Sequence, residues 1–144
     1  MAEKYDCLKL ENQICFPLYA ASREIIKKYH PFLEELELTY TQYIVMMVFW
    51  EDESITVKDL GKKLFLDSGT LTPVLKSLEV KGLVKRERSK EDERVVIARI
   101  TEDGLKMREK AVEIPMKMQG CANISSEEAA ELYRILHKML GDTM

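Results

Sequence analysis

Residues 56–101 carry the pattern that most restricts how this chain can fold. Apolar residues recur at intervals of three or four in two short runs on either side of the break LDS at 66–68, which predicts two amphipathic helices joined by a tight turn. Gly82 stands where the left-handed residue that ends many helices is expected. Apolar and charged residues then alternate on both sides of SKEDER at 89–94, which is typical of a β-hairpin. The segment is therefore predicted to be a winged helix-turn-helix.

Long helical patterns flank this segment on both sides. They are expected over about residues 8–29, over 31–37, from a Thr cap at Thr39 or Thr41, from Thr101 toward 118, and from Ser125 onward. The first of these helices is expected to end at His30, because the residue before a proline is disfavoured in a helix. The predicted fold class is mainly α with a small β-hairpin wing.

The charge distribution favours nucleic-acid binding by the central segment. The chain as a whole has a net charge of −3, which argues against a protein that coats nucleic acid with its entire surface. Residues 56–101, however, contain eleven Lys or Arg against seven Asp or Glu, whereas the rest of the chain contains eleven against eighteen. A cationic middle thus lies between anionic flanks, and double-stranded DNA is the expected partner.

The chain is expected to form a single domain that pairs with a second copy. At 144 residues it can bury one hydrophobic core, and no repeat or Gly/Ser linker divides it. The outer helices have wider apolar faces than such a core needs, so we predict a homodimer through the N- and C-terminal helices. We assign 1–55 and 102–144 to dimerisation and 56–101 to DNA binding.

Hydropathy and cysteine spacing narrow the class of protein further. No apolar run approaches the ~20 residues that span a bilayer, and the N-terminus lacks the order of a signal peptide, so we expect a cytoplasmic protein without membrane contact. Three scattered cysteines suit a reducing compartment. With only two histidines and no short paired spacing, no metal site is expected, and neither a cofactor motif nor a Ser-His-Asp or P-loop pattern indicates an enzyme.

Four stretches of the sequence resemble a known family. DERVVIARIT at 92–101 is similar to the wing signature of the MarR family of winged-helix regulators. KLENQICF at 9–16, LTYTQY at 38–43 and LDSGTLTPVLK at 66–76 together resemble its organic hydroperoxide resistance branch, and the resemblance runs over nearly the whole chain. It implies a homodimeric transcriptional repressor that binds a palindromic operator and releases it when a cysteine near the N-terminus is oxidised by an organic hydroperoxide.

Cys15 matches the reactive cysteine of that branch, and Tyr29 and Tyr40 match the tyrosines that hydrogen-bond its sulfur across the dimer. Spacing agrees with this: Cys15 and Tyr29 share a helix face but lie about 21 Å apart on a continuous helix, so an antiparallel second copy could join them and one chain could not. If a helix restarts at Pro17, its N-terminus favours the thiolate that attacks peroxide. The alternative is a small buried apolar residue, the commonest fate of a free cysteine.

Two further cysteines have open roles. Cys121 lies in QGCANISS, between the last two predicted helices. Some members of the branch carry a second cysteine in this region that forms a disulfide with the reactive one of the other subunit, so the resemblance makes Cys121 a candidate resolving cysteine. Cys7 is interpreted as an incidental surface or interface residue.

The candidate DNA contacts lie at the start of the second motif helix and at the wing tip. Small polar residues that can enter a major groove are Ser68, Gly69, Thr70 and Thr72. Lys76 is placed for a phosphate, and Arg94 can reach an adjacent minor groove with Asp92 orienting its guanidinium. The alternatives are ordinary helix capping by Asp67 or Ser68 and a surface ion pair of little energetic value.

Two other functions are compatible with the sequence. A MarR-type repressor could be released by a small apolar or phenolic ligand at the junction of dimer and wing, with Cys15 purely structural. A thiol peroxidase would instead consume peroxide catalytically. If a Cys15→Ser protein still responds to inducer, the repressor is released by a ligand and not by oxidation. If peroxide is consumed catalytically and not stoichiometrically, the protein is a thiol peroxidase.

Overall fold

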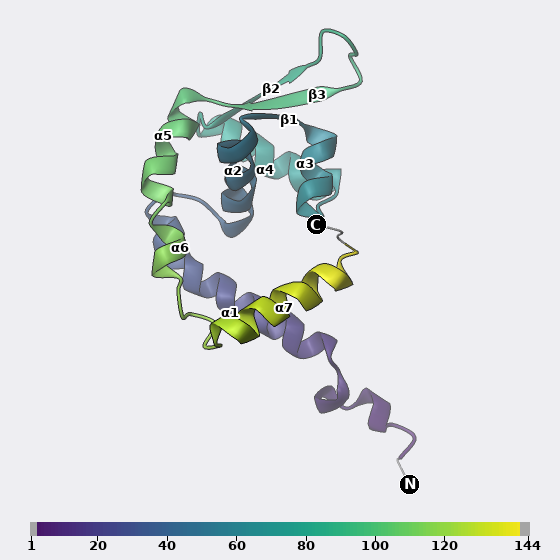
Figure 1. The fold of residues 1–144 in the computed structure, drawn as a ribbon. Helices are drawn as coiled ribbons and strands as arrows, with labels where there is room; N and C mark the ends of the chain where they lie inside the picture. Colours follow the sequence, from purple (N-terminus) through teal and green to yellow (C-terminus); the bar gives the residue numbers. More distant parts are fainter. Residues whose placement is uncertain (1–2, 142–144) are drawn as a thin grey trace.

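The computed structural model describes residues 3–141 and consists of two parts (Figure 1). The elements in chain order are η1 (Asp6–Leu8), η2 (Leu10–Asn12), α1 (Cys15–Glu34), α2 (Tyr40–Asp52), β1 (Ser54–Thr56), α3 (Val57–Leu64), α4 (Ser68–Val80), β2 (Val84–Arg88), β3 (Val96–Ile100), α5 (Glu102–Ala111), α6 (Ile114–Lys117) and α7 (Ser126–Met139). A winged-helix unit of α2 to α4 with the strands lies at one end, and α1 and α7 lie at the other.

The winged helix-turn-helix is confirmed, with one strand more than expected. β2 and β3 form the predicted antiparallel hairpin, with Val84 opposite Ile100, and β1 adds a third strand on the other side of β3. Three residues are too few for a periodicity signal, so β1 could not be recognised from sequence. In the helix-turn-helix, Gly61 of α3 permits the close approach of the turn that follows this helix, since a Cβ there would lie 2.8 Å from the Leu66 carbonyl oxygen.

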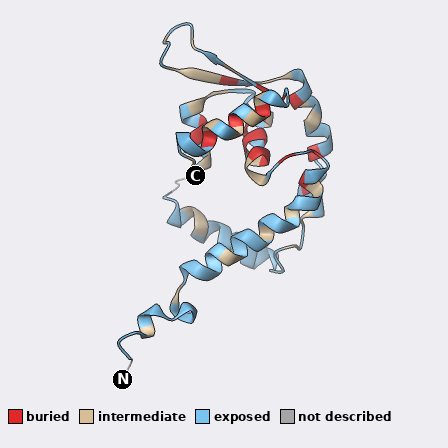
Figure 2. Ribbon diagram, turned by 180° about the vertical axis from the view of Figure 1, so that it is seen from behind, coloured by how far each residue is buried: buried red, intermediate tan, exposed pale blue. Residues whose placement is uncertain are grey.

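The core is built around α2. Thr39 begins this helix as predicted: its hydroxyl accepts the Gln42 N–H, and the Gln42 side chain accepts the Thr39 N–H, which forms a complete capping box. Val45, Met46 and Phe49 of this helix have no exposed surface and pack against α3, α4 and the sheet. Buried residues are concentrated in this unit (Figure 2).

The first helix differs from the prediction at both ends. It begins at Cys15 and not near Leu8, because two short 3₁₀ turns precede it, and it continues through Pro31 to Glu34 instead of ending at His30. Packing explains the continuation: Leu33 is only 2% exposed, so burying it offsets the hydrogen bond that Pro31 cannot donate. The chain turns at Glu37, which has left-handed backbone (φ 55°).

The helix predicted from Thr101 toward 118 is divided into α5 and α6. Thr101 caps α5 by accepting the Gly104 N–H, and Pro115 lies in the first turn of α6, where a missing N–H costs little. The last helix is capped by Ser125 as predicted, and Glu128 completes a capping box. No described helix is long and apolar enough to cross a membrane.

The helices at the lower end leave much apolar surface uncovered. No residue of α7 is buried, and Leu33 is the only buried residue of α1. Large apolar side chains exposed on these two helices are Phe16, Leu18, Tyr19, Ile26, Leu132, Tyr133, Ile135 and Met139. Exposed apolar faces of this extent are typical of surfaces that pair with another chain.

Candidate functional site

Cys15 is the first residue of α1 and is exposed to solvent. In a single copy, therefore, Cys15 is not a buried packing residue. Pro17 is the third residue of α1, so the helix begins two residues before this proline and not at it, and Cys15 lies at the helix N-terminus. No side chain caps this helix end and no acidic residue lies in its first turn. The partial positive charge of the N-terminus is thus available to an anion next to it.

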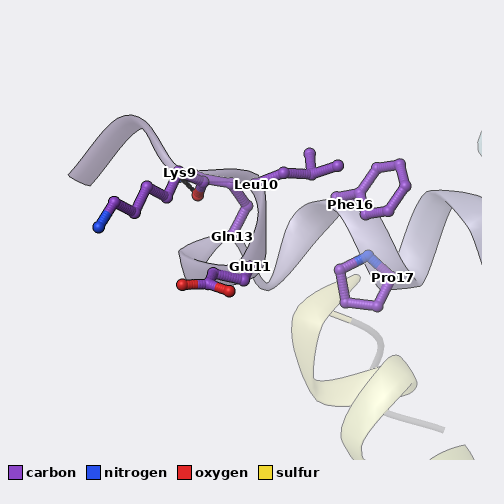
Figure 3. A pocket seen from close by; sticks show the side chains of 6 residues that line it. All are labelled: Lys9, Leu10, Glu11, Gln13, Phe16 and Pro17. Atoms are coloured by element: carbon purple, nitrogen blue, oxygen red, sulfur yellow. Dashed lines mark hydrogen bonds between the residues drawn. The ribbon is translucent and has the colours of Figure 1, made fainter. Parts of the chain in front are cut away.

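A cavity of about 680 Å³ lies beside this end of α1 (Figure 3). Its walls come from residues on both sides of Cys15 in the sequence, and they are Lys9, Leu10, Glu11, Gln13, Phe16 and Pro17. The Gln13 side chain fixes the preceding turns by donating to the carbonyl oxygens of Cys7 (2.7 Å) and Lys9 (2.8 Å). The chain therefore forms a concave surface beside the start of α1.

Three tyrosines form a cluster at the other end of α1. The Tyr29 ring lies 5.0 Å from the Tyr40 ring and 5.8 Å from the Tyr43 ring, measured between centroids. Burial raises the pKa of all three hydroxyls above the ordinary value, so they remain protonated donors at neutral pH. Within residues 3–141, the hydroxyls of Tyr29 and Tyr40 have no hydrogen-bond partner.

One chain does not bring the cysteine and the tyrosines together. Cys15 and Tyr29 lie on the same uninterrupted helix, fourteen residues apart, which corresponds to about 21 Å. In a single copy, the exposed thiol and the two tyrosine hydroxyls without a hydrogen-bond partner therefore remain at opposite ends of α1.

Cys121 belongs to the tyrosine end of this arrangement. It lies in the turn after α6, and its carbonyl oxygen accepts a hydrogen bond from Lys28 of α1, the residue before Tyr29. Burial first, and then the electrostatic effect of Cys121, raise the pKa of Tyr29. Cys7 is exposed and its thiol contacts only the Lys4 carbonyl oxygen, at 3.8 Å. In one chain, therefore, Cys121 lies near Tyr29 and away from Cys15.

The candidate DNA contacts lie on two neighbouring elements. Asp67 caps α4 by accepting the Thr70 N–H at 2.8 Å, which confirms the capping alternative without covering the helix start. Of the predicted residues of α4, Ser68, Gly69, Thr70 and Lys76 are exposed and Thr72 is partly buried. The beginning of α4 thus presents small polar groups to solvent, as a helix that reads a groove must.

At the wing tip, Arg94 and Asp92 form a two-pronged ion pair. The guanidinium donates from Nε to Oδ1 (3.1 Å) and from Nη2 to Oδ2 (3.3 Å), and the Arg94 backbone N–H also donates to Oδ1. These hydrogen bonds lower the pKa of the Asp92 carboxyl. The Arg94 side chain remains 91% exposed, so the carboxylate fixes the direction of the guanidinium and leaves it accessible.

Neither a metal site nor a catalytic constellation is formed by these residues. Within residues 3–141, no group of three or more His, Cys, Asp or Glu side chains could hold a metal ion. The arrangement can bind DNA at one end and carry out thiol chemistry at the other.

Sequence and structure comparisons agree on the family. A family model described as transcriptional regulator SarA/Rot matches residues 27–111. An organic hydroperoxide resistance transcriptional regulator of Bacillus subtilis (strain 168) is 50% identical over 140 residues, which cover 97% of this chain and 95% of that protein. The chain belongs to the organic hydroperoxide resistance branch of the MarR family. Because these relatives are transcriptional regulators, we place it among regulators and not among enzymes.

Solved structures of the family share this fold. AbfR of Staphylococcus epidermidis, solved in reduced form bound to DNA, is 34% identical with a TM-score of 0.78, and the alignment covers 96% of this chain and 97% of that one. AbfR has also been solved in an overoxidised form bound to DNA and in a disulfide form. MarR from E. coli, solved as a mutant with operator DNA, has a TM-score of 0.81 with 96% and 99% coverage, and its 22% identity supports the fold alone.

Sequence reasoning missed one polar group in this regulator. Gln42 of α2 is buried, with 6% of its surface exposed, and it contacts Ser77 of α4 and Lys81, the residue that follows this helix. A signal was present, since Gln42 stands inside the otherwise apolar run of α2. Its partners, however, lie 35 and 39 residues away, and no local pattern identifies them.

Proposed function

We propose that this chain is a DNA-binding transcriptional repressor that senses organic hydroperoxides by oxidation of Cys15 and then releases its operator. The observation that carries the proposal is the divided site: an exposed Cys15 begins the same helix that holds Tyr29 about 21 Å further on, beside Tyr40. The relative from Bacillus subtilis is named for organic hydroperoxide resistance, and its 50% identity supports the same signal for this chain.

A homodimer closes the divided site. If two copies of α1 pair in antiparallel fashion, the two-fold axis brings Cys15 of each copy to the tyrosine cluster of the other. The exposed apolar faces of α1 and α7 would be covered in the same contact. We therefore keep 1–55 and 102–144 as the dimerisation segments and 56–101 as the DNA-binding segment.

The proposed chemistry uses the cysteine as nucleophile and the tyrosines as donors. The Cys15 thiolate attacks the terminal oxygen of the hydroperoxide, the O–O bond breaks, and the organic part leaves as an alkoxide that takes up a proton to become an alcohol. The sulfur is oxidised to a sulfenic acid, and hydrogen bonds from Tyr29 and Tyr40 stabilise its anionic forms before and after the reaction. No cofactor or metal takes part in this scheme.

Cys121 is the proposed resolving cysteine. Since it lies near Tyr29, the dimer that brings Cys15 to the tyrosines of the other copy also brings it toward that copy's Cys121. Condensation of the sulfenic acid with this thiol would form an intersubunit disulfide and release water. A mixed disulfide with a small thiol is the other outcome, and intact mass distinguishes the two.

Release of DNA follows from a change in the distance between the two DNA-binding segments, 56–101 of each copy, which we call the reading heads. In each copy, the start of α4 with Ser68, Gly69, Thr70 and Thr72 would enter a major groove, Lys76 would contact a phosphate, and Arg94, held by Asp92, would reach the neighbouring minor groove. Both reading heads must contact their half-sites of a palindromic operator at the same time, so a small shift of one reading head strongly lowers the affinity of the dimer for the operator. Such a repressor acts on chromosomal DNA, and we propose a cytoplasmic location.

Operator binding measured together with intact mass tests the proposal. Reduced wild-type protein and the Cys15→Ser, Cys7→Ser and Cys121→Ser variants are compared by fluorescence anisotropy before and after an equimolar amount of cumene hydroperoxide. Wild type and Cys7→Ser should gain an oxygen or a covalent link and release DNA, whereas Cys15→Ser should stay bound and unmodified. Release of Cys15→Ser by the peroxide would refute the proposal. Mass also separates reversible oxidation from overoxidation, in which AbfR has been solved on DNA.

A cavity between the helix-turn-helix and the wing supports a second candidate, release by a small ligand. It has a volume of about 990 Å³ and is lined by residues of α3, by the start of α4 and by Arg94, Val95 and Val96. An apolar or phenolic molecule bound there would separate α4 from the wing. In that case Cys15→Ser should respond to the inducer as wild type does.

A further inference from the structure

Gln42 connects two elements whose relative position decides whether DNA is bound. Of the polar and charged residues between 3 and 141, it alone is buried. Its Nε2 donates to the Ser77 hydroxyl at 2.8 Å, and its Oε1 accepts from the Lys81 ammonium at 3.0 Å. Ser77 lies in α4 and Lys81 ends that helix. The amide thus holds the C-terminal part of the helix that begins with the proposed DNA contacts.

The same amide also caps α2. Oε1 accepts the Thr39 N–H at 3.0 Å, while the Gln42 N–H donates to the Thr39 hydroxyl at 3.1 Å. One oxygen atom therefore serves both the first turn of α2 and the link to α4. If the first turn unwinds, the amide moves with it, and the contacts to Ser77 and Lys81 are lost together with the cap.

Tyr40 stands on the other side of that first turn. It precedes Gln42 by two residues, which is a rotation of about 200° around the helix. Tyr40 faces Tyr29 of α1, with ring centroids 5.0 Å apart, whereas Gln42 faces α4. Lys81 also links α4 to the turn between α1 and α2, because its ammonium donates to the carbonyl oxygen of Glu37 in that turn.

We propose that Gln42 is a positioning residue that transmits the state of the cysteine–tyrosine site to the DNA-reading helix α4 through Ser77 and Lys81. The inference rests on the proposed function, in which the sulfur of Cys15 contacts Tyr40. Displacement of Tyr40 after oxidation disturbs the capping box, and the shared amide then frees the end of α4. Because a helix moves as a rigid body over this length, release at Ser77 shifts the residues at the start of α4.

The test removes the link from the α4 side and leaves the capping box in place. Full-length Ser77→Ala/Lys81→Met retains Gln42 and Thr39, and Lys81→Met keeps the length of the side chain. The matched control is Asp52→Asn, which breaks the Asp52–Lys63 ion pair (3.0 Å) between the other end of α2 and α3. Three quantities are measured: the rate of Cys15 oxidation by cumene hydroperoxide, thermal unfolding, and operator affinity before and after oxidation.

We expect the double variant to oxidise at the wild-type rate while the ratio of oxidised to reduced operator Kd falls about tenfold, since coupling between two sites commonly has this size. The control should keep the wild-type ratio. Gln42→Glu should also keep it, because a carboxylate preserves the cap and accepts from both the Ser77 hydroxyl and the Lys81 ammonium. A purely structural role would lower the unfolding temperature and leave the ratio unchanged.

The two proposals fail in different ways. Wild-type release by peroxide together with an unaltered ratio in the double variant overturns the positioning role alone. Absence of release in wild type after Cys15 oxidation overturns both proposals. If the double variant does not fold, Ser77→Ala alone removes the hydrogen bond from Gln42 Nε2, and alanine is favourable in a helix. The same change in the ratio of operator Kd values then tests the positioning role.

Discussion

The rings of Tyr29 and Tyr40 lie tilted by 55° to each other with centroids 5.0 Å apart, and within the described part of the chain neither hydroxyl has a hydrogen-bond partner. Neither hydroxyl is buried away from solvent, so both can donate to an arriving acceptor. A cysteine sulfur from a second copy is such an acceptor. The relationship between these two residues, more than the cysteine itself, points to a site shared between subunits.

Removal of either hydroxyl should slow oxidation of Cys15. Tyr29→Phe and Tyr40→Phe keep the contact between the two rings and delete only the donor. A hydrogen bond to a charged acceptor contributes about 1.5 kcal/mol or more, so each variant should react with cumene hydroperoxide about tenfold more slowly in stopped-flow thiol assays. Tyr133→Phe, on the exposed face of α7, is the control and should react like wild type. Unchanged rates in both variants would mean that the tyrosines do not contact the sulfur.

Stability should decrease above pH 10 because of the same cluster. Burial raises the pKa of Tyr29, Tyr40 and Tyr43 above 10.0 in the folded chain. Above that pH, unfolded chains lose these protons while the folded protein keeps them, so the free energy of unfolding is fully retained below about pH 10 and falls as pH rises toward the folded values. Urea unfolding from about pH 9 to about pH 11 should show a shallower decline for Tyr40→Phe than for wild type. Tyr5→Phe, at an exposed position, should follow wild type.

The two ends of α1 illustrate what sequence patterns can and cannot predict. A helix start close to Pro17 was compatible with the sequence, because a proline is tolerated in a first turn, but the apolar spacing favoured an earlier start near Leu8. The continuation through Pro31 was not predictable, because it depends on Leu33 reaching a core formed by α2. Local rules give the free energy that a proline costs inside a helix. Only the tertiary packing, here the burial of Leu33, determines whether other interactions offset that cost.

Pro31 therefore offers a stability test. It lies inside α1 with its ring exposed, so Pro31→Ala restores a backbone donor to the Lys27 carbonyl oxygen without removing core packing. We expect the free energy of unfolding to rise by about 1–2 kcal/mol, less than the full cost of an interior proline because the unfolded chain also gains freedom. Pro115→Ala, in the first turn of α6, should change stability little. Urea denaturation of the reduced protein measures both, and a loss of stability in Pro31→Ala would show that the proline shapes the native helix.

The candidate site divides in a similar way between predictable and unpredictable parts. Residues whose role depends on local sequence, such as the cap at Asp67 and the Asp92–Arg94 pair, lie as the pattern indicated. Gln42 depends on contacts across 35 residues, and the neighbourhood of Cys121 and Tyr29 depends on how α1 and α6 lie together. Such long-range proximity follows from the packing of helices and leaves no periodic signal.

Arg94 should contribute to DNA affinity through charge at the wing tip. Arg94→Ala is expected to weaken operator binding about tenfold and to reduce the slope of log affinity against log salt by about 1, because one phosphate-neutralising cation is lost. Asp92→Asn keeps an acceptor for the Arg94 N–H and should have a smaller effect, since it only frees the guanidinium to move. Lys106→Ala removes an exposed cation on α5, away from the wing, and controls for net charge. Anisotropy titrations at several salt concentrations measure the operator affinity of each variant. Equal losses of affinity in Arg94→Ala and Lys106→Ala would mean that the Asp92–Arg94 pair is only a surface ion pair.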